Sequence, residues 1–148
     1  MASWISTVAV GTDGSETAGR ALAAAVELAE RFGARLVVLS AFDGHARKES
    51  APRLSGAVPA DPGWASNAAE QTERILAVAE ESAAERGIRC SSAMAEGDAG
   101  EVLVRLAEQH GADVLVVGSK GMERRVLGSV PNTVTHKAGC SVLLVKTA

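Results

Sequence analysis

Five short apolar runs divide the chain, and longer segments with the period of a helix lie between them. The runs cover residues 7–11, 36–41, 88–94, 114–118 and 142–146. In the fourth run, every residue from Val114 to Val117 is apolar, as in a parallel strand that helices cover on both faces. The pattern therefore predicts five strands in an internal parallel sheet.

The segments between the runs predict four helices, over residues 16–32, 67–86, 100–110 and 131–137. Apolar residues recur in them at intervals of three and four, which places Ala21, Leu22 and Ala25 on one face of the first helix. Gly33 follows this helix, where a left-handed C-terminal cap is expected. The alternation predicts a single α/β domain with a doubly wound open sheet of five parallel strands, in the flavodoxin-like order 3-2-1-4-5.

Residues 43–66 break this alternation. They contain three of the four prolines and no sustained apolar period. We expect a long loop here, either a surface excursion or a segment that acts as a lid or contacts a partner.

Composition narrows the range of functions. Apolar residues make up 47% of the 148 residues and aromatic residues 3%, with no tyrosine, so a single domain with an aliphatic core is expected. The net charge of -3 provides no basic field for nucleic acid. No apolar run approaches the roughly 18 residues that span a bilayer. The first residues do not resemble a secretory signal, so we expect a cytoplasmic protein in which Cys90 and Cys140 are buried free thiols.

Ligands of an open parallel sheet bind outside the carboxyl ends of its strands, where the strand order reverses. In the predicted order this point lies between the first and fourth strands. The first strand leads into Gly11, Thr12 and Asp13, and the Asp13 carboxylate is placed to accept ribose hydroxyls or to help hold a divalent cation beside phosphates. Ser15 is expected to cap the helix that follows.

The fourth strand leads into a glycine-rich segment that predicts a phosphate cradle in two parts. Gly118 and Gly121 leave backbone N–H groups accessible, and Lys120 adds a positive charge between them. Gly128 and Ser129 then precede a helix whose free N–H groups and positive dipole end face the same place. Ser129 is expected to donate to a phosphate, to cap this helix, or both.

Two further segments reach the predicted crevice. Residues 38–41, at the end of the second strand, offer backbone groups and an apolar wall to an adenine ring, although core packing is the default for such a run. Gly97 follows the third strand, where Gly97 and Asp98 are expected to contact a ligand or to cap the next helix. The sequence has no Walker, Rossmann or nucleophile-elbow motif and no His or Cys spacing typical of a metal site, so no catalytic residue is predicted.

The chain resembles the universal stress protein family over nearly its whole length. The likeness rests on VGTDGS at 10–15, ADVLVVGS at 112–119, LGSVP at 127–131 and CSVLLV at 140–145. The resemblance implies an adenine nucleotide alpha hydrolase-like fold, ATP phosphates bound by a G-x2-G-x9-G-[ST] motif, and dimers formed through the last strand. That strand is represented here by Val142, Leu143, Leu144 and Val145.

The residue patterns and the resemblance together define one candidate set of nucleotide-binding residues. Asp13 is also the candidate ligand for magnesium bound through the phosphates. The full set is Gly11, Thr12, Asp13, Val38, Ser40, Ala41, Gly97, Gly118, Ser119, Lys120, Gly121, Gly128, Ser129, Val130 and Pro131.

The phosphate segment is shorter than the family motif. Six residues, 122–127, separate Gly121 from Gly128, three fewer than the motif has. We expect ATP, with or without magnesium, as the first ligand, and cyclic AMP or AMP as the alternative because each has a single phosphate. The leading function is a nucleotide-responsive signalling homodimer with an unidentified protein partner. A weak ATP hydrolase and a nucleotide-free dimerisation protein stay open.

Overall fold

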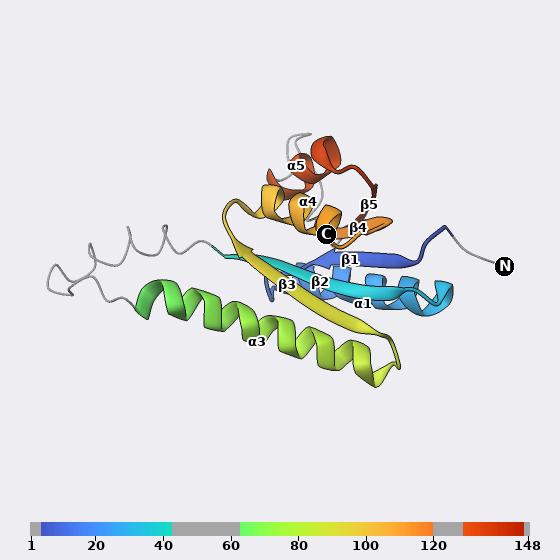
Figure 1. Ribbon diagram of the computed structural model, residues 1–148, viewed down its shortest axis with the longest axis horizontal. Helices are drawn as coiled ribbons and strands as arrows, with labels where there is room; N and C mark the ends of the chain where they lie inside the picture. Colours follow the sequence, from blue (N-terminus) through green and yellow to red (C-terminus); the bar gives the residue numbers. More distant parts are fainter. Residues whose placement is uncertain (1–3, 43–62, 120–128, 147–148) are drawn as a thin grey trace, which may run out of the picture.

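Strands and helices alternate along the chain in the computed structural model, which describes residues 4–42, 63–119 and 129–146 (Figure 1). The order of elements is β1 (Thr7–Gly11), α1 (Glu16–Phe32), β2 (Arg35–Phe42), α3 (Gly63–Glu85), β3 (Cys90–Glu96), α4 (Ala99–Gln109), β4 (Val114–Ser119), α5 (Ser129–Lys137) and β5 (Ser141–Lys146).

All five strands form one parallel sheet in the order β3-β2-β1-β4-β5, which confirms the predicted fold class and strand order. β1 is central, because Val8 pairs with Leu36 of β2 on one side and with Val114 of β4 on the other. The carboxyl ends of the strands therefore meet at a single edge of the sheet, and the order reverses between β1 and β4.

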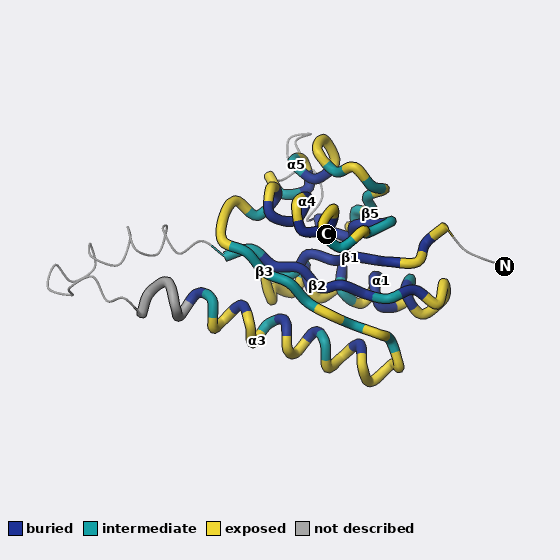
Figure 2. Tube along the Cα trace, viewed as in Figure 1, coloured by how far each residue is buried: buried dark blue, intermediate teal, exposed yellow. Residues whose placement is uncertain are grey.

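Helices cover both faces of the sheet, with α1 and α3 on one face and α4 and α5 on the other (Figure 1). Successive strand residues point to opposite faces. Val8 and Val10 thus join the core beneath α1 and α3, whereas Ala9 joins the core beneath α4. β1 is buried throughout and β4 at every residue except Gly118 (Figure 2), because each strand contributes side chains to two separate aliphatic cores.

Two element boundaries differ from the predicted ones around the second helix of the sequence. α3 begins at Gly63, four residues before the predicted start, so residues 63–66 belong to a helix and not to the predicted loop. The apolar period that predicts this helix starts only at residue 67, so it gives no signal for the turn before it. Residues 43–62, the rest of the predicted loop, lie outside the described residues.

β3 covers residues 90–96 and not the predicted 88–94. Ile88 suggested a strand because it is apolar, but its N–H donates to the Ala83 carbonyl (3.2 Å) in the turn after α3. The side chain of Ile88 still packs against the core beneath α1 and α3. Ile88 therefore belongs to the turn that ends α3 and does not pair with a neighbouring strand.

The last helix also begins earlier than predicted, at Ser129 and not at Pro131. A proline in the first turn needs no hydrogen-bond partner for its nitrogen, so the helix can begin before it. Ser129 is consequently the first residue of α5, and the prediction that it precedes the helix as a cap is wrong.

The two cysteines are free, as predicted, but half-buried and not fully buried. Burial, with a smaller effect of the Glu80 carboxylate, raises the pKa of Cys90 to about 11. Burial is also the main cause that raises the pKa of Cys140. Both thiols are thus poor nucleophiles at neutral pH. Among the described helices, none is both long and apolar enough to cross a membrane.

Candidate functional site

A cavity of about 150 Å³ opens at the carboxyl ends of β1 and β4, at the point where the strand order reverses. The first turns of α1 and α4 and the start of α5 complete its walls. The residues that line it are Gly11, Thr12, Asp13, Ser15, Thr17, Ala18, Ala41, Ala99, Leu103, Val117, Gly118 and Val130.

Local hydrogen bonds hold the turn between β1 and α1. The N–H of Thr12 continues the β1–β2 ladder by donating to Leu39 O (2.9 Å), and the Gly14 N–H donates to Thr12 Oγ1 (3.2 Å). The Ser15 N–H donates to Asp13 Oδ1 (2.9 Å), so one carboxylate oxygen of Asp13 is fixed by the backbone two residues later. The Asp13 side chain is exposed and lines the cavity.

Ser15 caps α1 as predicted. Its Oγ accepts the Ala18 N–H (3.2 Å), and its extended backbone (φ -75°, ψ 168°) is typical of an N-cap. The first turn of α1 therefore directs the positive end of its dipole toward the cavity, an arrangement that favours anionic groups.

The cavity lining is apolar where β2, α4, β4 and α5 contribute and polar, apart from Ala18, around the start of α1; we call these parts its apolar half and its polar half. Five apolar side chains from β2, α4, β4 and α5 form the first half, and four polar side chains around the start of α1 form the second. The apolar residues are Ala41, Ala99, Leu103, Val117 and Val130, and the polar residues are Thr12, Asp13, Ser15 and Thr17. Such a site suits a ligand with a flat apolar portion at one end and hydroxyl or anionic groups at the other.

Six of the fifteen sequence-predicted site residues line this cavity. They are Gly11, Thr12, Asp13, Ala41, Gly118 and Val130. The rule that parallel strands direct their carboxyl ends to one edge was sufficient to bring together the ends of β1, β2 and β4, whereas Val130 comes from the first turn of α5.

Five other predicted residues lie elsewhere. Val38 is fully buried in the core, and Ser40 is buried with its Oγ donating to Thr12 O (2.7 Å), so Ser40 holds the end of β1. Ser119 and Pro131 are also buried and are not among the lining residues. Gly97, with φ 139°, donates its N–H to Phe42 O (2.9 Å) and precedes the α4 cap.

Of the two roles predicted for Asp98, ligand contact or helix capping, a hydrogen bond supports capping. Asp98 Oδ2 accepts the Glu101 N–H (3.1 Å), which makes Asp98 the N-cap of α4. Ser129, in turn, is exposed at the start of α5. Lys120, Gly121 and Gly128, the rest of the predicted phosphate cradle, lie outside the described residues.

Sequence reasoning did not assign ligand contacts to Ser15, Thr17, Ala18, Ala99 or Leu103, which also line the cavity. Ser15 was interpreted only as a cap. The helical period could have placed Ala99 and Leu103 on one face of α4, four residues apart. Which end of that face reaches the cavity depends on how α4 packs on the sheet, and the sequence pattern does not contain that information.

The cavity offers little support for a bound metal. Asp13 is the one carboxylate among the described lining residues, and no group of three or more His, Cys, Asp or Glu side chains that could hold a metal occurs in the described part of the chain. A magnesium ion here would need phosphates and waters for most of its ligands.

Residues 5–146 match the family model described as universal stress protein family. The chain belongs to the universal stress protein family. Universal stress protein YxiE of Bacillus subtilis is 31% identical over 144 residues, which cover 93% of this chain and 96% of the relative. Universal stress protein Rv1636 of Mycobacterium tuberculosis is 34% identical over 153 residues, which cover 95% and 96%. The resemblance inferred from the sequence is confirmed.

Solved structures of the universal stress protein family share this fold. A universal stress protein crystallised in complex with cAMP superposes with a TM-score of 0.70 at 30% identity and covers 99% of this chain and 100% of its own. A family member from Burkholderia pseudomallei superposes with a TM-score of 0.74 at 30% identity, with 98% of each chain covered.

Proposed function

We propose that this universal stress protein binds an adenine nucleotide in the cavity at the carboxyl ends of β1 and β4. The observation that carries the proposal is the division of the cavity into an apolar half and a polar half at the start of α1. The base would occupy the slot between Ala41, Leu103 and Val130. The ribose would face Asp13, whose carboxylate can accept ribose hydroxyls, and the phosphate would face the positive end of α1.

Cyclic AMP is the nucleotide that we place first, ahead of the ATP expected from the sequence. The cAMP complex of a family member that is 30% identical to this chain supports it. The shortened segment between Gly121 and Gly128 also supports a ligand with one phosphate. ATP is the second candidate, and in that case Asp13 would help to hold magnesium through the phosphates.

We further propose that the protein acts as a homodimer in the cytoplasm and transmits nucleotide occupancy to a protein partner. Support for a dimer comes from β5, an edge strand of the sheet with an exposed Leu143. Support for a cytoplasmic location comes from Cys90 and Cys140, which are unpaired and would stay reduced there.

Filling the apolar half of the cavity tests the proposal. Ala99, half-exposed in the first turn of α4, lines the cavity without belonging to either core, so Ala99→Leu adds volume where the base would bind. We expect calorimetric titration with cyclic AMP, AMP and Mg-ATP to show affinity reduced at least about tenfold, equivalent to about 1.4 kcal/mol.

The matched control is Ala23→Leu, the same change at an exposed position of α1 that does not line the cavity. This control should bind each nucleotide as the wild type does, and both variants should melt within about 4 °C of it, because surface changes alter stability by about 0.5 kcal/mol or less. A wild-type protein that binds none of the three nucleotides would contradict the proposal. Equal binding by Ala99→Leu would exclude this cavity as the site.

A further inference from the structure

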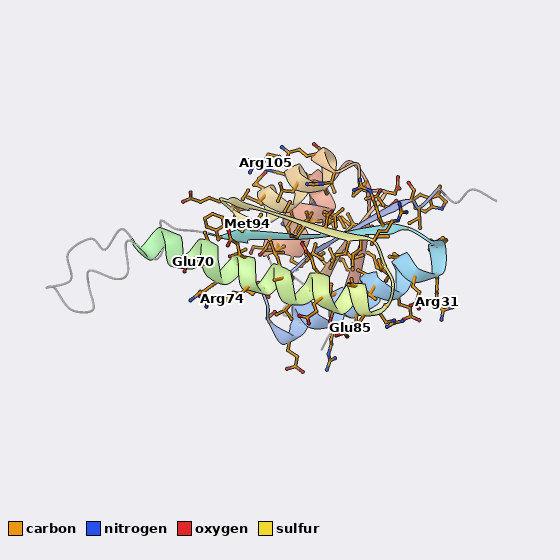
Figure 3. The ribbon with its side chains drawn as sticks, turned by 60° about the horizontal axis from the view of Figure 1, so that its bottom comes forward. Arg31, Glu70, Arg74, Glu85, Met94 and Arg105 are labelled. Atoms are coloured by element: carbon orange, nitrogen blue, oxygen red, sulfur yellow. The ribbon has the colours of Figure 1, made fainter. Side chains whose placement is uncertain are left out.

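A second hollow lies behind the turn that forms the polar half of the cavity. It is a groove of about 370 Å³ between α1 and α3, two helices that lie side by side on the same face of the sheet (Figures 1 and 3). Its lining residues are Thr12, Gly14, Ser15, Gly19, Leu22, Arg74, Ile75, Val78 and Ala79. Thr12 and Ser15 line both hollows, so the turn forms a thin wall between them.

The side chain of Ile75 rests against this wall at Gly14. A Cβ built on Gly14 would lie 3.0 Å from Ile75 Cδ1, 3.1 Å from Cγ1 and 3.6 Å from Cγ2. Gly14 has φ 80°, a conformation that residues with a side chain rarely adopt. The turn therefore depends on a glycine, the most flexible residue, at the point where α3 touches it.

α3 is a firm support for this contact, because it is anchored on the sheet independently of Ile75. Leu76, Ala79 and Ala83 are buried in the core that α3 shares with α1. Beyond the end of α3, Arg86 donates to both carboxylate oxygens of Glu30 on α1 (2.8 and 3.0 Å). Ile75 itself does not line the nucleotide cavity.

We propose that Ile75 is a positioning residue for the nucleotide site. Its side chain limits the movement of Gly14 and so keeps Asp13 and Ser15 in the geometry that the ligand meets. A turn that is ordered before the ligand arrives loses less conformational entropy on binding. The inference rests on the proposed function. It implies that nucleotide binding and the contact of α3 with the turn are energetically coupled.

Coupling of this kind acts in both directions. If Ile75 strengthens nucleotide binding by ordering the turn, then a bound nucleotide must in turn stabilise the contact of α3 with the turn. The groove side of α3, where Arg74 and the 66% exposed Val78 reach solvent, would then respond to nucleotide occupancy.

A graded series at Ile75 tests the role. Ile75→Val deletes Cδ1, the atom nearest to the Cβ position of Gly14, and Ile75→Ala deletes Cγ1 and Cγ2 as well. In titrations of the full chain with cyclic AMP, we expect Ile75→Ala to weaken binding by roughly three- to thirtyfold and Ile75→Val by less, in line with couplings measured for residues that do not touch the ligand.

Two controls separate positioning from general stability. Val78→Ala removes an exposed side chain from the same groove, and Leu76→Val removes core packing at the neighbouring position of α3. We expect Leu76→Val to lower the melting temperature and yet to bind cyclic AMP within about twofold of the wild type, a change of about 0.4 kcal/mol. Val78→Ala should change neither quantity.

Hydrogen exchange provides a second readout, which does not depend on the measured affinity. In Ile75→Ala without nucleotide, the amides of Gly14 and Ser15 should exchange faster, while those of β1 stay protected. In the wild type, cyclic AMP should slow exchange in α3 around Ile75. Unchanged affinity together with unchanged exchange at Gly14 and Ser15 would overturn the role of Ile75. The titration of the wild type tests the proposed function separately. A wild type that binds no nucleotide would overturn that function, whatever the variants at Ile75 show.

Discussion

Gly118 lies where the first turn of α1 leaves no room for a side chain. A Cβ there would lie 2.8 Å from both the carbonyl oxygen and Cγ2 of Thr17. The oxygen belongs to the helix backbone and cannot rotate away. Close packing of α1 on β4 therefore explains this glycine, in addition to the access for phosphates expected from the sequence.

Gly11, at the end of the adjacent strand β1, differs from Gly118 in what surrounds it. A Cβ at Gly11 would lie 2.7 Å from Cδ1 of Leu103, the end of a side chain that can change rotamer. We therefore predict that Gly118→Ala lowers the free energy of unfolding by about 1–3 kcal/mol, whereas Gly11→Ala costs less. Urea denaturation of both variants measures the difference, and equal losses would show that the backbone of α1 adapts.

The elements of the sheet are joined at its amino end by one carboxylate. Asp113, in the turn before β4, accepts the N–H groups of Ser6 (2.8 Å) and Thr7 (3.0 Å) through Oδ2. Its own N–H donates to Thr7 O (2.9 Å), and its carbonyl accepts the Ser141 N–H (3.3 Å). Asp113 thus aligns the starts of β1, β4 and β5, at the end of the sheet opposite the cavity.

These hydrogen bonds make the contribution of Asp113 to stability dependent on pH. The backbone N–H groups of Ser6 and Thr7 lower the pKa of Asp113, so its stabilising effect is present above its unfolded pKa of about 3.9 and is lost as pH falls through the lower folded value. We predict that Asp113→Asn costs about 1 kcal/mol at pH 7 and progressively less below about pH 4. Urea denaturation at several pH values checks this, and a cost that stays constant with pH would refute it.

The fold could be predicted from the sequence because each element has its own local signal. The apolar runs placed β1 and β4 within one residue, and Gly33 ends α1 at φ 65° as expected. The errors at Ile88 and at the start of α3 arose where an apolar residue or a helical turn lacks the usual periodic context. The local apolar pattern of the sequence therefore predicts the presence of an element more accurately than its first and last residues.

The candidate site was only partly predictable, for a different physical reason. Asp13 lies two residues after β1 and Gly118 lies near the end of β4, so topology alone brings them to one edge of the sheet. Leu103 and Thr17 reach the cavity from the sides of helices, and that depends on the rotation of each helix on the sheet. Similarly, no pattern in α3 indicates that Ile75 would contact Gly14, 61 positions earlier.

At the scale of the whole molecule, the two edges of the sheet differ. α3 covers one face of the β3 edge, where Cys90 and Met94 pack against the core beneath it. On β5, Val142 and Leu144 pack beneath α4 and α5, whereas Leu143 points to the opposite face and stays 40% exposed. Among the described residues β5 pairs with β4 alone, and an edge strand that carries an exposed leucine is suited to pairing with a second copy of itself.

The proposed homodimer predicts that a charge at Leu143 separates the subunits. Two-fold symmetry would bring two introduced carboxylates into the same interface, where burying each costs several kcal/mol. We expect Leu143→Asp to sediment as a folded monomer at concentrations where the wild type is a dimer, because Leu143 is the apolar residue of β5 that belongs to neither core. The control is Val78→Asp, the same charge at a 66% exposed apolar residue of α3, and it should remain dimeric. If Leu143→Asp sediments as a dimer with the wild-type dissociation constant, the subunits do not associate through β5.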